Sequence, residues 1–254
     1  MVISKRFLIR FLMQTFILTY LSWSVIIVAN MFGIIGFNTP FGMLLFIVGT
    51  WSPTVFSYIC LKKNGSIRGI KDFVKIAFSF KQKPFNYFMV FAFLLLLYMP
   101  SVIIIGANVD TAWYLVFPIF PLMIIDGGLE ELGWRYLLQP TLEKRFHFII
   151  ATTITASIWL IWHLPLFFIA GSGQSNMTFS LFAIFIYGGS FSLAAIFKIS
   201  NSVWLCILFH ALINTLSIYW SVAQNFLATL IASVCMVALS IALVFHQKTI
   251  VRIK

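Results

Sequence analysis

The amino-acid sequence predicts an all-α polytopic membrane protein with about eight transmembrane helices. Of its 254 residues, 61% are hydrophobic and only 9% are charged, and the mean hydropathy is +1.03. In a soluble domain about a quarter of the residues are charged. Because one span needs about 20 apolar residues, the chain has room for eight spans and little else. We therefore expect residues 1–254 to form a single transmembrane domain.

Apolar stretches of the required length recur along the whole chain. The first follows the basic stretch MVISKRFLIR and continues to about Phe37 without a convincing signal-peptide cleavage site. We therefore expect a retained span over residues 8–33. The other predicted spans cover residues 41–61, 85–106, 114–139, 148–170, 178–198, 202–220 and 223–246.

The basic residues predict how these spans are oriented. All 17 Lys and Arg residues except Arg135 lie near the chain ends or in alternate connections. They are Lys5, Arg6 and Arg10; Lys62, Lys63, Arg68, Lys71, Lys75, Lys81 and Lys83; Lys144 and Arg145; Lys198; and Lys248, Arg252 and Lys254. Neither type occurs in the connections 34–40, 107–113, 171–177 and 221–222. By the positive-inside rule both termini are cytoplasmic. The net charge of +11 therefore reflects topology and does not indicate nucleic-acid binding.

The basic segment 62–84 leaves two interpretations open. Apolar residues such as Phe73 and Ile76 are interspersed among its lysines. The segment could be an ordinary cytoplasmic loop. It could equally contain a short interfacial helix that lies on anionic lipid.

Ionisable residues inside the predicted spans mark a candidate site. Half of the six acidic residues fall between Asp126 and Glu131, where the chain reads DGGLEE. Later spans contain His163, His210 and Asn214. Ionisable groups within a membrane are costly and are usually retained for function.

Helical spacing separates the two adjacent glutamates. Glu131 and Arg135 are four residues apart, so they share one face and are expected to form an ion pair that supports the structure. Glu130 lies about 100° around the helix and points elsewhere. His210 and Asn214 are also four residues apart, so both can face one point.

Each polar residue taken singly has a simpler explanation. A lone histidine or asparagine in a span often serves as a hydrogen-bonding contact between helices. On straight helices His163 would also lie roughly 7 Å nearer the outer face than Glu130 and His210. Their joint occurrence nevertheless favours a polar cavity between the spans 114–139, 148–170 and 202–220.

Three short patterns in this region resemble the motifs of a known family. EELGWR fits E-E-x-x-x-R, WLIWH resembles F-x-x-x-H with Trp159 at the aromatic position, and HALIN fits H-x-x-x-N. Their order is similar to that in the CPBP family of intramembrane proteases, also called the CAAX protease and bacteriocin-processing (Abi) family. The resemblance covers roughly residues 115–220.

The resemblance implies peptide-bond hydrolysis within the membrane. Glu130 would activate a water molecule as a general base, and His163 would orient that water or share its proton. His210 and Asn214 would donate hydrogen bonds to the developing oxyanion. Asp126 is not part of the motif as we know it. Because it lies one turn before Glu130, it is a candidate modulator of the pKa of Glu130. The alternative is that Asp126 caps or satisfies a neighbouring helix.

The cofactor is left open between two alternatives. Glu130, His163 and His210 could supply three ligands to zinc. The chain has no H-E-x-x-H motif, in which one helix supplies two ligands. We therefore favour a reaction without a metal or other cofactor.

Two non-proteolytic functions remain as alternatives. The protein could be a membrane scaffold that binds a sensor kinase or confers bacteriocin immunity. Such a role does not require the four polar residues Glu130, His163, His210 and Asn214. A transporter with a buried carboxylate relay would be expected to contain helices broken by paired glycines. Gly127–Gly128 and Gly188–Gly189 are better explained as helix contacts. We expect a peptide or membrane-protein substrate and a location in the bacterial cell membrane.

Overall fold

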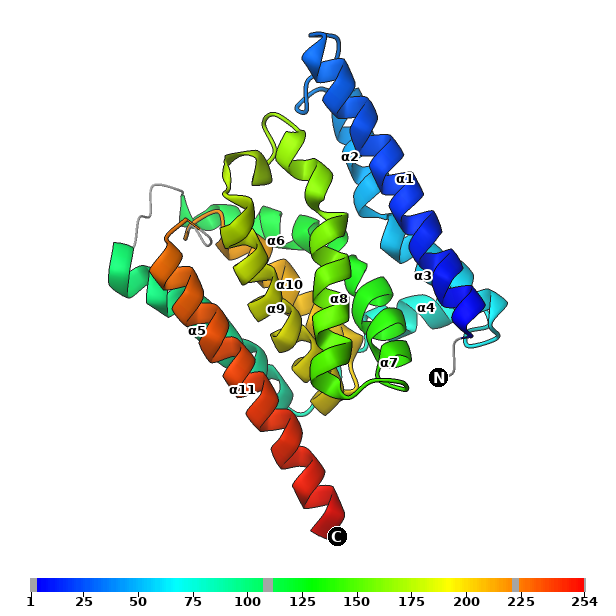
Figure 1. Cartoon of the computed structure of the whole chain (residues 1–254), viewed down its shortest axis with the longest axis vertical. Helices are drawn as coiled ribbons and strands as arrows, with labels where there is room; N and C mark the ends of the chain where they lie inside the picture. The colour runs from blue at the N-terminus through cyan, green and yellow to red at the C-terminus, as the bar shows by residue number, and fades with distance from the viewer. Residues whose placement is uncertain (1–3, 107–111, 221–223, 254) are drawn as a thin grey trace.

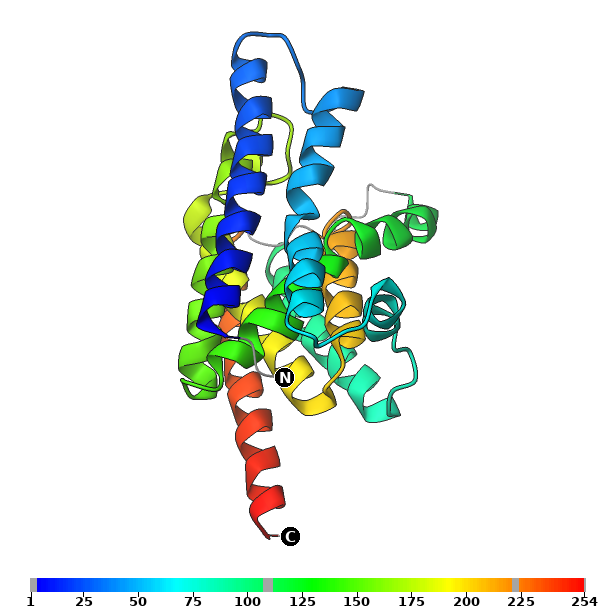
Figure 2. The same ribbon diagram turned by 90° about the vertical axis from the view of Figure 1, so that its right-hand side faces the viewer.

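The structure, a computed structural model, describes residues 4–106, 112–220 and 224–253. Within these residues the chain forms helices and connections, and no strand occurs. This confirms the predicted all-α class. Long helices run side by side along the main axis of the molecule, and α6 lies across that axis (Figures 1 and 2).

Six helical segments of the described chain are long and apolar enough to cross a membrane. They are α1 (Lys5–Met31), α2 with α3 (Pro40–Thr50 and Ser52–Lys63), α5 (Pro84–Ile105), α8 with the 3₁₀-helix η4 (Phe148–Trp162 and Leu164–Phe168), α9 (Phe179–Ser200) and α11 (Phe226–Ile253, apolar to Gln247). A shorter apolar helix, α10, covers Val203–Leu216. The total of eight spans therefore stays a prediction.

The predicted continuous helix over residues 114–139 is wrong. This segment consists of η1 (Trp113–Leu115), α6 (Val116–Ile125), the 3₁₀-helix η2 (Gly128–Glu130), the π-helix η3 (Leu132–Leu138) and α7 (Gln139–Leu142). Hydropathy averages over the whole segment and does not register the breaks within it. Single π-helical turns are rare and often occur at functional sites.

The Gly127–Gly128 pair lets the broken segment approach α10 closely. A Cβ atom at Gly127 would lie 2.5 Å from Asn214 Nδ2, and one at Gly128 would lie 2.9 Å from Ile207 Cγ2. A larger residue at Gly128 would also meet the backbone oxygen of Ile207 at 3.0 Å, and one at Gly127 would displace the Asn214 amide. The pair is therefore a close-packing contact, as the sequence predicts.

The connections divide between two ends of the molecule. The α3–α5, α7–α8 and α9–α10 connections lie toward the same end as the N-terminus, whereas the α1–α2 and α8–α9 connections lie toward the other (Figure 1). The first end carries the basic segments of the sequence. It also includes the short helix α4 (Ile70–Ala77), so the segment 62–84 contains a helix as well as a loop. Contact of α4 with lipid stays a prediction.

Candidate active site

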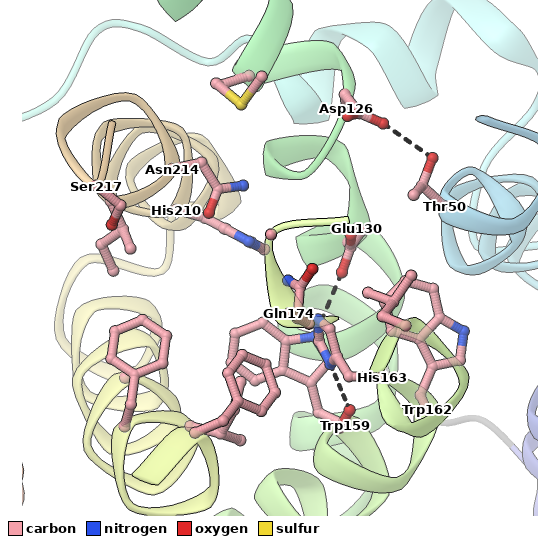
Figure 3. Close-up of a pocket in the computed structure, with 18 of the residues that line it drawn as sticks. Thr50, Asp126, Glu130, Trp159, Trp162, His163, Gln174, His210, Asn214 and Ser217 are labelled. Carbon is pink, nitrogen blue, oxygen red and sulfur yellow. Dashed lines mark hydrogen bonds between the residues drawn. The ribbon is translucent and has the colours of Figure 1, made fainter. Parts of the chain in front are cut away.

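A cavity of about 450 Å³ brings the predicted site residues together. Its wall includes Asp126, Glu130, His163, His210 and Asn214 (Figure 3). The remaining lining is mostly apolar and comes from α1, α2, α6, α8, η4, the α8–α9 connection, α9, α10 and the residues that follow α10. The 7 Å offset expected for His163 therefore does not keep it away from Glu130 and His210.

Glu130 lies at the end of η2, where the chain turns into the π-helix. It is 5% exposed, and its Oε2 atom accepts hydrogen bonds from the indole N–H groups of Trp134 and Trp159, each at 3.3 Å. Both donors approach the same carboxylate oxygen. They fix the plane of the carboxylate without using the second oxygen.

Glu131 is fully buried behind this wall and contacts two cationic or potentially cationic partners. Its Oε2 lies 3.5 Å from Arg135 Nε, and its Oε1 lies 2.8 Å from His210 Nδ1. The predicted pair with Arg135 is present, and the contact with His210 adds a second partner. Arg135 also donates to Ser190 Oγ at 3.1 Å, and its guanidinium lies 4.9 Å from the Trp159 ring centre. We call Glu131, Arg135, His210 and Ser190 the Glu131 cluster.

His163 occupies the C-cap of α8 instead of a position inside a longer helix. Its Nδ1 atom lies 2.7 Å from the backbone carbonyl of Trp159. Because a carbonyl oxygen can only accept, Nδ1 carries the proton in this hydrogen bond. The other ring nitrogen, Nε2, is then an acceptor in neutral His163.

His210 and Asn214 are one turn apart on α10, and both line the cavity, as their spacing predicts (Figure 3). Glu131 accepts from the Nδ1 of His210 and so fixes the orientation of the imidazole. The Asn214 amide is held close to the backbone of Gly127. Both side chains can supply N–H donors to one point in the cavity.

Asp126 caps the end of α6 and does not share a helix with Glu130. Its Oδ1 accepts a hydrogen bond from Thr50 Oγ1 at 3.0 Å. The sequence argument placed Asp126 and Glu130 on one face of a continuous helix, and that argument fails because the helix ends at Ile125. Both carboxylates nevertheless line the same cavity.

Sequence reasoning missed several of these contacts. Trp134 follows Glu130 by four residues, and this spacing could have indicated a contact. The motif assigns Trp159 only as an aromatic residue, and its indole N–H is an additional donor. Ser190, Thr50 and Gln174 join the site from distant parts of the chain, and no local pattern marks them.

The proposed zinc ligands do not form a recognisable metal centre in the described part of the chain. Glu130, His163 and His210 line one cavity, yet no three His, Cys, Asp or Glu side chains among the described residues are grouped as metal ligands. His210 also uses Nδ1 to contact Glu131. This contact leaves Nε2 of His210 available, so the choice between a metal-free reaction and one with zinc stays a prediction.

Comparison with known proteins agrees with the three sequence motifs. Residues 111–216 match the model of the type II CAAX prenyl endopeptidase Rce1-like family. The chain is also 26% identical over 234 residues to CAAX prenyl protease 2 of Methanococcus maripaludis. That alignment covers 80% of this chain and 81% of the archaeal protein.

The fold and the comparisons define an all-α integral membrane protein with protease relatives. The chain is similar to the type II CAAX prenyl endopeptidases, and the resemblance to the CPBP family is thereby confirmed. The comparisons support an intramembrane endopeptidase.

Proposed function

We propose that this protein hydrolyses a peptide bond of a peptide or membrane protein with a water molecule activated by Glu130. One observation carries the proposal. The Glu130 carboxylate is held by two indole donors at the wall of a cavity that also contains His163 and His210. A carboxylate held in this way beside groups that can bind water or donate hydrogen bonds supports the proposed role of Glu130 as the base.

Each polar group has a distinct part in the reaction. Glu130 takes a proton from the water as it attacks the peptide carbonyl. The neutral Nε2 of His163 accepts a hydrogen bond from the same water and orients it. Glu130 then returns the proton to the leaving amine, so that the Glu130 carboxylate is regenerated and the products are a carboxylic acid, which retains the second water proton, and an amine.

His210 and Asn214 stabilise the negative charge that develops on the carbonyl oxygen. The Asn214 amide donates in every protonation state. With its Nδ1–H bonded to Glu131, His210 donates through Nε2 when it is an imidazolium, and Glu131 supplies the balancing charge. One such donor in a preorganised site contributes about 3–4 kcal/mol to transition-state stabilisation.

The archaeal relative is named as a CAAX prenyl protease, so a prenylated C-terminal peptide is one candidate substrate. Bacterial peptides and membrane proteins are the other candidates. We favour a metal-free reaction. Strong chelators should then leave cleavage intact, and purified active protein should contain well under one zinc per chain. Loss of activity on zinc removal and its return with added zinc would contradict this choice.

The decisive experiment compares membranes that contain wild-type protein with membranes that contain Glu130→Gln. New peptide termini should accumulate with the wild type and be absent with Glu130→Gln. Glu143→Gln is the matched control, because it makes the same chemical change at a side chain that pairs with Lys198 away from the cavity. Its pattern of termini should equal that of the wild type. Identical termini with Glu130→Gln would contradict the proposal.

A further inference from the structure

We infer that a second cavity binds the phosphate group of an anionic phospholipid. This cavity has a volume of about 900 Å³, and its lining comes from α4 and the residues that follow it, η3, α7, α9 and the start of α10. The α3–α5 and α9–α10 connections place it at the end of the molecule that carries the basic segments (Figure 1). We call it the basic cavity. Among the described residues it shares none with the cavity at Glu130, so lipid binding here does not depend on the proposed protease reaction.

Two lysines give the basic cavity its charge. Lys75 of α4 and Lys81 of the segment between α4 and α5 both line it, and both are exposed. Neither lysine forms an ion pair among the residues that the structure describes. The described lining also contains no Asp or Glu. Two positive charges without a balancing carboxylate favour an anionic ligand.

The N-terminus of α10 borders the same space. Ser202, the N-cap residue, and Val203, the first residue of the helix, line the basic cavity. The first N–H groups of a helix have no partner within the helix, and the partial positive charge at this end attracts anions. The Ser202 side chain makes no capping bond to these N–H groups. A phosphate oxygen could therefore accept from them.

The Ser202 hydroxyl is an independent indication of a ligand. The residue is 3% exposed, and its Oγ atom has no hydrogen-bond partner among the described residues. A buried hydroxyl without a partner is unfavourable and calls for an explanation. The neighbouring Asn201 has a φ of 54°, a left-handed conformation that asparagine tolerates, and its exposed side chain also lines the cavity. Both side chains can donate hydrogen bonds to phosphate oxygens.

The apolar part of the lining favours a phospholipid over a free phosphate ion. Phe78 and Phe80 line the basic cavity, and their ring centres lie 6.0 and 4.5 Å from that of Trp204 on α10. Phe80 is exposed, and so are Ile70 and Val74 of α4. Exposed apolar side chains beside lysines are typical of a segment at the membrane interface, and basic pockets between membrane helices bind lipid headgroups. A phospholipid supplies both the phosphate and an apolar body.

Binding of tritiated phosphatidylglycerol to the immobilised full chain in a neutral detergent tests this site. Scintillation proximity measures the dissociation constant and the number of lipids bound. Phosphatidylcholine with the same acyl chains is the reference, because its choline group balances the phosphate charge. We expect one phosphatidylglycerol per chain to bind about ten-fold more tightly than phosphatidylcholine. Equal affinity for the two lipids would overturn the inference.

Two variants with the same change in charge locate the binding. Lys75→Gln/Lys81→Gln removes the charges of the cavity, whereas the control Lys62→Gln/Lys63→Gln removes two exposed lysines at the end of α3, outside the lining. Each lysine near an anionic headgroup contributes about five-fold in affinity, so the cavity variant should bind about twenty-fold more weakly. The control should bind like the wild type. An equal loss in both variants, or no loss in the cavity variant, would overturn the inference.

Ser202→Ala tests the buried hydroxyl. The substitution removes no hydrogen bond made by the Ser202 side chain, so thermal unfolding in neutral detergent without added lipid should match that of the wild type. Its affinity for phosphatidylglycerol should fall about ten-fold, as expected for loss of a hydrogen bond to a charged group. Unchanged affinity in protein of normal stability would overturn the placement of the phosphate at the start of α10.

Inorganic phosphate distinguishes a lipid from a free anion. Phosphate is added in millimolar excess to the complex with tritiated phosphatidylglycerol, at an ionic strength held constant with chloride. It should leave the lipid bound, because it lacks the apolar body that contacts Phe78 and Phe80. Displacement of the lipid by inorganic phosphate would overturn the phospholipid as the occupant of the basic cavity.

Discussion

Two neighbouring regions of this molecule, the cavity wall at Glu130 and the Glu131 cluster behind it, each contain a glutamate, and the two glutamates have different surroundings. Glu130 borders an open space, where two indole groups hold its carboxylate. Glu131 is 0% exposed, with Arg135 on one oxygen and His210 on the other. A step of one residue therefore separates a carboxylate that can meet a substrate from one that can only support its neighbours.

The Glu131 cluster also joins segments that are distant in the sequence. His210 is 79 residues from Glu131, and Ser190 is 55 residues from Arg135. A buried pair is not in itself a strong source of stability, because desolvation offsets the attraction between the charges. Removing one partner is costly, because the remaining charge is left buried without compensation. Removal of one charged partner from the Glu131 cluster should therefore cause the largest loss of stability among the substitutions proposed here.

Glu131→Ala should destabilise the protein by about 3–5 kcal/mol, because it leaves the Arg135 guanidinium buried without its carboxylate. Thermal unfolding in detergent, measured beside Glu130→Gln, checks this result. Glu130→Gln should unfold near the wild-type temperature while losing activity. Glu143→Gln is the control, since it keeps an acceptor for Gln139 Nε2 and removes only the partly exposed ion pair with Lys198, and such pairs contribute about 0–1 kcal/mol. Equal destabilisation by Glu130→Gln and Glu131→Ala would remove the distinction between the two glutamates.

A second contrast between the cavity and packed surfaces lies on α9. A Cβ atom at Gly188 would lie 2.8 Å from Ser233 Cα, whereas one at Gly189 would meet nothing within 4 Å. Gly188→Ala should therefore destabilise the protein by about 1–3 kcal/mol through overpacking. Gly189→Ala should keep wild-type stability.

Gly189 also lines the cavity, so a larger side chain there should change substrate selection. Gly189→Leu should keep stability but slow cleavage of peptides with bulky apolar residues more than cleavage of peptides with small ones. Thermal unfolding and competition between paired peptides measure the two effects. Destabilisation by Gly189→Ala comparable to that of Gly188→Ala would show that the cavity face is packed after all.

Trp159→Phe tests how the indole donors hold the Glu130 carboxylate, and its effect should be smaller than that of Glu131→Ala. It removes one N–H donor from Glu130 but keeps an aromatic ring near Arg135 and His163. Since the resembling motif has phenylalanine at this position, we expect the protein to fold. A hydrogen bond to a charged group contributes about 1.5–3 kcal/mol, and the 3.3 Å distance favours the lower limit. The rate should fall about ten-fold.

Steady-state kinetics at several pH values check how Trp159 acts. Loss of a positioning contact should lower kcat more than it raises KM and should alter the pH profile. Trp134→Phe removes the other donor to the same oxygen and should give a similar result. An unchanged kcat and pH profile in both variants would show that the indole groups only pack.

The sequence was informative wherever one local pattern decided the structure. Apolar stretches predicted the long helices, and the four-residue spacing predicted the contact between Glu131 and Arg135. The break between Asp126 and Leu132 was missed because hydropathy counts apolar residues without regard to the backbone, although Pro121 and the Gly127–Gly128 pair are visible in the sequence. The bond between Glu131 and His210 depends on the packing of α10, and no spacing within one segment encodes it.

Among the substitutions proposed, Asp126→Asn should have the smallest effect, because Asp126 borders the cavity but does not belong to the Glu131 cluster. Asp126→Asn removes its charge but keeps an oxygen that can accept from Thr50, so stability should be unchanged. Without this negative charge in the cavity, Glu130 should ionise more easily, and the acidic limb of the pH–rate profile should move to lower pH. The move should be under about one pH unit, because the two residues do not share a helix. An unchanged acidic limb in protein of normal stability would leave Asp126 as the cap of α6 and the acceptor of Thr50.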